Sequence, residues 1–161
     1  MTQAAWPELP YEAWKDTYAT LHFSAPFYST LLRFNLDKFP EVEFDLAESY
    51  EVAPDLMSYT FKLKPNVKFH DGTPLTSADV KATYDRMRNP PQGVVSTRKA
   101  TFGDIGTIET PDPLTVIFKM KNVNAAMLEH FASPWNVIYS AKDLAADPAS
   151  PRTKINGTGP F

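Results

Sequence analysis

Fifteen prolines, set against only six glycines, are the feature that most limits how these 161 residues can fold. Proline fixes its own φ and has no amide hydrogen to donate, so it interrupts helices and the inner strands of sheets. We therefore expect short helices and strands joined by stiff turns, and no bundle of long helices. The chain is 43% hydrophobic, which supplies enough apolar surface for one compact core.

Cysteine content, charge and hydropathy exclude several classes of function. The chain has no cysteine, which rules out disulfides, thiolate zinc sites and cysteine nucleophiles. Its formal net charge is −3, without the basic excess of nucleic-acid binding proteins, so we expect no nucleic-acid partner. No stretch approaches the roughly 20 consecutive apolar residues of a membrane-spanning helix. We accordingly expect no direct insertion into a membrane.

Alternating apolar and polar residues predict two β-hairpins. The first joins residues 48–52 to residues 58–64, and the second joins residues 104–109 to residues 114–121. In each hairpin the apolar side chains recur at every second position, as the pleat of a half-buried strand requires. The aromatic side chains expected to fill the core are Tyr59, Phe61, Phe69, Tyr84 and Phe118.

A helix is predicted between the two hairpins. Thr76 can cap its N-terminus together with Asp79, three residues further on. Val80, Tyr84 and Met87 then recur at helical spacing and would form one buried stripe.

Three shorter apolar stretches also predict helices, over residues 11–22, 27–34 and 125–132. The expected fold class is therefore α+β. It consists of a small mixed or antiparallel sheet with two hairpins and flanking helices.

The residues that carry catalysis or bind metals form no recognisable motif. His22, His70 and His130 lie far apart in sequence and belong to no short ligand motif, so we expect no metal site. No G-x-S-x-G sequence places a serine nucleophile beside a base. We expect no catalytic residues, no cofactor and no enzymatic activity.

One long segment carries a specific resemblance. Residues 59–80, YTFKLKPNVKFHDGTPLTSADV, closely resemble the signature of the family 5 extracellular solute-binding proteins of ABC importers. This is the family of dipeptide- and oligopeptide-binding proteins. Three flanking stretches agree in the same order: DLAESYEVAPD at 45–55, ETPDPLTVIFKMK at 109–121 and NGTGPF at 156–161.

The resemblance implies a domain organisation. Residues 23–161 resemble an amino-terminal portion of such a protein, centred on the domain that supports the two ligand-binding lobes and truncated where the chain returns to lobe I. Residues 1–22 resemble instead the opening of an uncharacterised bacterial family. Two positions depart from the family's pattern, since Leu56 and Asn66 stand where turn glycines are frequent. Asn tolerates a positive φ, whereas Leu56 predicts a differently built turn.

The resemblance also implies a function. The chain would be part of the substrate-binding component of an ABC transporter, would perform no chemistry and would deliver its solute to an ABC permease. A di- or oligopeptide is the expected solute, with nickel, opines, sugars and glutathione left open. Family members are periplasmic, or extracellular and lipid-anchored. The first ten residues lack a basic start and an apolar run, so the chain as written predicts a cytoplasmic location.

Ligand-binding residues follow from the resemblance alone. The loop after the signature helix approaches the solute in similar proteins, which points to Arg98 and neighbouring Lys99. The stretch before the first helix of lobe I points to Phe23. Two alternatives stay open: a self-standing structural or assembly domain that binds no ligand, and a small enzyme.

Overall fold

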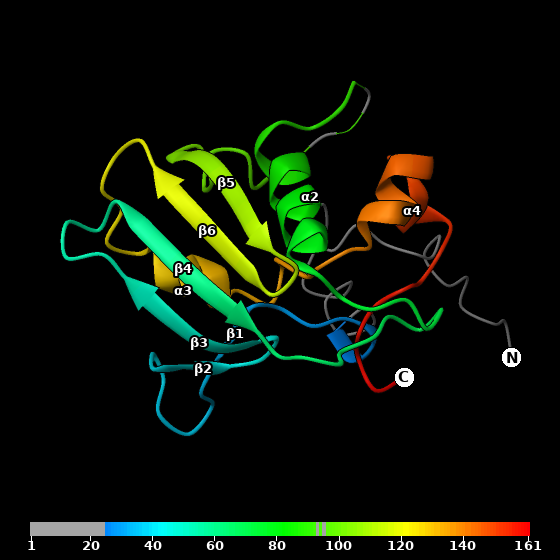
Figure 1. The fold of residues 1–161 in the computed structure, drawn as a ribbon, viewed down its shortest axis with the longest axis horizontal. Coiled ribbons are helices and arrows are strands. Elements are labelled where there is room, and N and C mark those ends of the chain that lie inside the picture. The colour runs from blue at the N-terminus through cyan, green and yellow to red at the C-terminus, as the bar shows by residue number, and fades with distance from the viewer. Residues whose placement is uncertain (1–24, 93, 95) are drawn as a thin grey trace, which may run out of the picture.

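The computed structural model describes residues 25–92, 94 and 96–161, and Figure 1 shows its fold. The helix expected over residues 11–22 lies outside the described residues. The largest element is a four-stranded antiparallel sheet in the order β3-β4-β6-β5. Its strands are β3 (Ala47–Val52), β4 (Ser58–Leu63), β5 (Ile105–Asp112) and β6 (Thr115–Met120).

The two predicted hairpins are β3–β4 and β5–β6, so the predicted α+β fold with an antiparallel sheet is confirmed. β4 joins them by pairing with β6, which places Phe61 opposite Val116 in the middle of the sheet. Both residues are fully buried.

Helices α2 (Ser77–Arg88) and α3 (Met127–Ala132) cover one face of this sheet, and α4 (Ala141–Ala146) packs against α2. The α4 helix has no counterpart among the expected elements. Short 3-10 turns lie at Ala25–Phe27 (η2) and Ser150–Arg152 (η3). The opposite face of the sheet carries polar side chains such as those of Lys62 and Lys119, which are exposed.

The start of α2 is stabilised as the sequence predicts. One carboxylate oxygen of Asp79 accepts hydrogen bonds from the Thr76 backbone amide at 2.7 Å and from the Thr76 hydroxyl at 2.9 Å. These contacts satisfy groups that the first turn of a helix leaves unpaired. The predicted stripe of Val80, Tyr84 and Met87 is fully buried.

An aromatic cluster holds the helices on the sheet. Phe131 of α3 lies at its centre, with ring centroids 4.7 Å from Phe118, 5.0 Å from Phe61 and 5.6 Å from Tyr84. The Tyr84 ring meets the ring of Phe102 edge to face at 5.1 Å. Such tilted and edge-on contacts add to the free energy of apolar burial. All five expected core aromatics are buried, and so is Phe102.

The helix predicted over residues 27–34 is wrong. After η2 the chain has no helix in this stretch and forms strand β1 (Leu32–Phe34). Strand β1 pairs antiparallel with β2 (Val42–Phe44). A short apolar run has no period that separates a helix from a buried strand. Pairing with a partner ten residues away decides between them.

Two turns contain left-handed residues other than glycine. Asn66 has a φ of 63°, which confirms that its turn needs a positive φ. Leu56 has a φ of 58°, so the turn keeps the conformation that glycine favours and the expectation of a different backbone is wrong at this position.

Within the described ranges, no helix combines the length and the apolar character that crossing a membrane requires.

Candidate functional site

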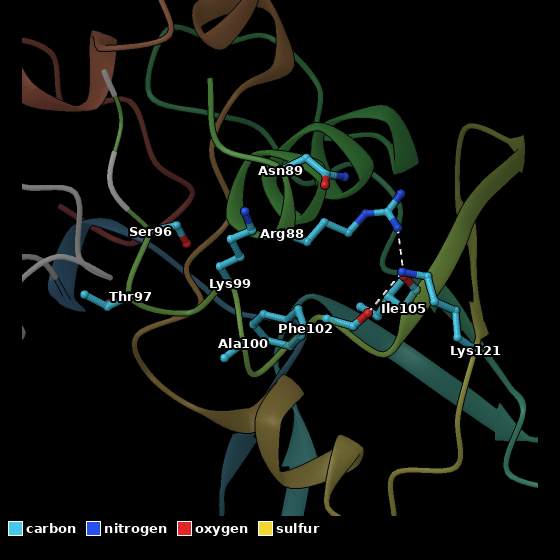
Figure 2. Close-up of a pocket in the computed structure, with 10 residues that line it drawn as sticks. Arg88, Asn89, Ser96, Thr97, Lys99, Ala100, Phe102, Ile105 and Lys121 are labelled. Carbon is cyan, nitrogen blue, oxygen red and sulfur yellow. Dashed lines mark hydrogen bonds between the residues drawn. The ribbon is translucent and has the colours of Figure 1, made fainter. Parts of the chain in front are cut away.

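A pocket of about 580 Å³ opens where the C-terminal end of α2 meets the loop of residues 96–103, beside the first residue of β5. Figure 2 shows the side chains that surround it. The lining residues are Arg88, Asn89, Ser96, Thr97, Lys99, Ala100, Phe102, Gly103, Ile105 and Lys121. Phe102 and Ile105 give it an apolar floor, since both belong to the buried core. The other lining groups are mostly polar or charged.

Two of the three cations in the lining are used by the fold itself. The Arg88 guanidinium donates to two backbone carbonyls at the start of β5, at 2.9 and 2.7 Å, and pairs with Asp85 at 2.7 Å. The Lys121 ammonium donates to the Gly103 carbonyl at 3.2 Å. Figure 2 shows this bond and the bond from Arg88 to Ile105. The Arg88 charge is therefore paired with a carboxylate, and the Lys121 ammonium already makes one hydrogen bond.

Lys99 is the predicted ligand residue that the structure places in the pocket lining. Its ammonium has no hydrogen-bond or ion-pair partner among residues 25–92, 94 and 96–161. Figure 2 shows it extending from its loop toward the end of α2. In the same lining, the Ser96 hydroxyl is buried and has no partner within the described part of the chain. A cation and an unsatisfied hydroxyl on one wall suit a ligand with an anionic group.

The structure places Arg98, the neighbouring predicted residue, outside this lining. Its guanidinium carbon lies 5.6 Å from the centre of the Trp135 ring, over the ring face. Burial lowers the pKa of Arg98 from its ordinary value. Its Nε is buried and lacks a hydrogen-bond partner in the described structure. An aromatic face stabilises a cation without accepting a conventional hydrogen bond, so the Nε–H of Arg98 is still an unused donor.

The remaining predictions concern Phe23 and metals. Phe23 lies outside the described residues, and so does His22. In the segments that the structure describes, no group of three or more His, Asp or Glu side chains is arranged to hold a metal ion.

A second pocket, of about 420 Å³, shares no lining residue with the first. It is bounded by Tyr28 and Phe34 and by Val137 and Pro160. Its charged groups are already paired, because Arg33 contacts Glu43 at 2.6 Å and the Asp45 carboxylate accepts a backbone amide. The first pocket is the better candidate for binding an anionic ligand.

Of the residues that line the first pocket, sequence reasoning named only Lys99, and the polar ones that it missed are Arg88, Asn89, Ser96, Thr97 and Lys121. One signal was present, since the residue that ends a helix lies beside the loop that follows it. Nothing in the sequence placed the end of β6 at the same pocket.

A family comparison places the chain among known proteins. The sequence model of the bacterial extracellular solute-binding proteins, family 5 (middle), matches residues 41–161. A putative ABC transporter peptide-binding protein of Brucella ovis is 40% identical over 131 residues. That match covers 78% of this chain and 24% of the relative.

Two further matches agree with the family. The glutathione-binding protein GsiB of Pectobacterium atrosepticum is 35% identical over 152 residues, covering 94% of this chain and 28% of the relative. The solved structure of AgaA from A. tumefaciens R10, in complex with agropinic acid, is 34% identical with a TM-score of 0.84. It covers 93% of this chain and 30% of that one. The chain thus spans about a quarter of the length of the curated relatives.

Proposed function

Because the chain belongs to the bacterial extracellular solute-binding proteins, family 5, we propose that it forms part of the solute-binding component of an ABC importer. The observation that carries this proposal is the family match over residues 41–161. The match includes the signature hairpin, α2 and the second hairpin, which together form the sheet and its helical cover.

A short peptide is the solute class that we propose. One relative is named for peptide binding and another for glutathione binding. AgaA is described in complex with agropinic acid. Peptides, glutathione and agropinic acid are all small and carry a carboxyl group, which is the group that an unpartnered lysine recognises.

We assign the solute's carboxylate to Lys99. Arg88 and Lys121 already donate to backbone carbonyls. Lys99 is the lining cation whose ammonium has no hydrogen-bond or ion-pair partner among the described residues. Arg98 precedes it on the same loop and, with its unsatisfied Nε, would contact the solute from beside Trp135. Phe23 is the third contact we propose, from the segment that precedes η2.

The partner and the location follow from the same assignment. We propose that the protein passes its solute to an ABC permease and acts outside the cytoplasm, as the family's description indicates. The division between a segment of residues 1–22 and a solute-binding body of residues 23–161 belongs to the same proposal. Binding, without chemistry, is the role assigned to this body.

Ligand-detected NMR tests the proposal. Saturation transfer to a tripeptide is measured with the full 161-residue chain, and the peptide is compared with its C-terminal amide. A hydrogen bond to a charged group contributes about 1.5–3 kcal/mol, so Lys99→Ala should weaken binding by about tenfold or more.

The matched control is Lys119→Ala, which removes an exposed lysine from β6 outside the pocket. It should leave binding unchanged, and the amide should bind more weakly than the free acid. Equal signals from Lys99→Ala and the unaltered chain would contradict the assignment of the carboxylate. Absence of transfer from any tripeptide at millimolar concentration would contradict binding by this chain.

A further inference from the structure

Three backbone segments, distant in sequence, meet at one junction, which we define as Phe27, His70, Gly157 and Gly159. The Gly159 amide donates to the Phe27 carbonyl at 3.0 Å, and the His70 amide donates to the Gly157 carbonyl at 3.0 Å. In Figure 1 the first described segment and the C-terminal end lie together at this place.

The junction leaves no room for side chains on its glycines. A Cβ at position 157 would overlap the Phe27 carbonyl oxygen, and one at position 159 would overlap the carbonyl of Pro26. Neither glycine has a positive φ, so close approach of the backbones is what requires them.

The imidazole of His70 bonds to the same segment through both ring nitrogens. The Gly157 amide donates to Nδ1 at 3.2 Å, and Nε2 lies 3.0 Å from the Gly159 carbonyl oxygen. An amide can only donate and a carbonyl can only accept, so Nδ1 must carry no proton and Nε2 must carry one. The neutral Nε2–H tautomer alone satisfies both contacts.

A second proton would change the junction. Imidazolium has a hydrogen on both nitrogens, so Nδ1–H would face the Gly157 N–H and that hydrogen bond would be lost. Imidazole is the side chain that ordinarily changes charge between about pH 5 and 8. His70 is exposed, so solvent protons reach it.

The charged groups around His70 keep their own partners. Asp71, on the same turn, accepts from the Thr73 hydroxyl at 2.6 Å and lies 3.9 Å from Lys142 of α4. These hydrogen bonds with Thr73, followed by the nearby lysines, lower the pKa of Asp71. Asp143 of α4 pairs with Lys154 at 2.7 Å. The charges of these two lysines and two aspartates balance, and within the described part of the chain none of the four side chains makes a hydrogen bond or ion pair with the imidazole.

We propose that His70 is a pH-sensitive latch that holds residues 157–159 against its own turn when its imidazole is neutral and loosens them when it is protonated. The remaining contacts limit the opening. The Asp71 amide still donates to the Asn156 side chain at 3.2 Å, so acid weakens the junction without detaching it. The latch acts on backbone position, and none of its residues lines the pocket that contains Lys99.

NMR of the full chain tests the latch directly. Long-range ¹H–¹⁵N correlation gives the tautomer of His70, and amide exchange gives the protection of the Gly157 N–H relative to an unstructured peptide at the same pH. We expect the Nε2–H tautomer at pH 8. Protection at Gly157 should fall by about fivefold or more between pH 8 and pH 5, as loss of one hydrogen bond predicts.

The control variant is His70→Asn, whose amide oxygen can accept near the position of Nδ1 but does not titrate. Its Gly157 protection should change by less than about twofold over the same range. The Leu63 amide, which donates to Leu114 at 2.8 Å in the sheet, serves as the internal reference. A Nδ1–H tautomer at pH 8, or an equal fall in protection in His70→Asn, would overturn the latch. If that variant does not fold, the tautomer and protection of the unaltered chain decide alone.

Discussion

Replacing Gly157 by alanine should separate the two backbones that cross at the junction. The added Cβ would overlap the Phe27 carbonyl oxygen and lie 2.7 Å from the Tyr28 ring. Backbone atoms have no rotamer by which to move away, so the segments must part. Three hydrogen bonds then weaken together, two between His70 and Gly157 and one from Gly159 to Phe27. At about 0.5–1.5 kcal/mol each, the free energy of unfolding should fall by about 1.5–4.5 kcal/mol.

Urea unfolding followed by circular dichroism measures this loss, and Gly72→Ala is the matched control. Gly72 has a φ of 83° and open space around its Cβ position, so the same substitution adds only left-handed strain. That strain costs about 1–2 kcal/mol. The reasoning is refuted if Gly157→Ala lowers the free energy of unfolding by no more than Gly72→Ala does.

The remaining predictions concern the core, one turn and two buried phenols. Phe131→Ala should lower the free energy of unfolding by about 3–5 kcal/mol, whereas Phe39→Ala, at a side chain 73% exposed, should change it by less than about 0.5 kcal/mol in the same urea assay. Leu56→Gly should raise it by about 0.5–1 kcal/mol because left-handed strain is relieved, and a lowered urea midpoint would contradict this. Burial raises the pKa of Tyr28 to about 12 and also raises that of Tyr84. The neutral phenols therefore contribute their full share to the free energy of unfolding below pH 10, and this free energy should fall as the pH rises from 10 toward 12. Tyr84→Phe should make that alkaline fall shallower in pH-dependent unfolding, and an unchanged slope would count against burial as the cause.

Local patterns in the sequence were enough to predict the middle of the fold. The capping pair at Thr76 and the helical stripe that follows it act within one helix, so neighbours in sequence determine them. The hairpins were predictable for a similar reason, because each pairs strands separated by one turn.

Features that depend on distant residues were not predictable. Residues 32–34 form a strand instead of part of a helix because β2 is available to pair with them. The sequence does not reveal that β4 pairs with β6 or that α4 packs on α2. The pocket is of this kind as well, since Lys99 and Lys121 meet there only after the sheet has formed. The position of Lys99 was named from a family resemblance, and its role stays a prediction.

Amide chemical-shift mapping with a short peptide tests the central claim most directly, because it locates the bound solute on the whole chain. The account predicts shifts concentrated in residues 96–103 and at Asn89, with the exposed face of the sheet around Lys62 unaffected. Shifts confined to that exposed face, or no shifts at saturating peptide, would contradict the account.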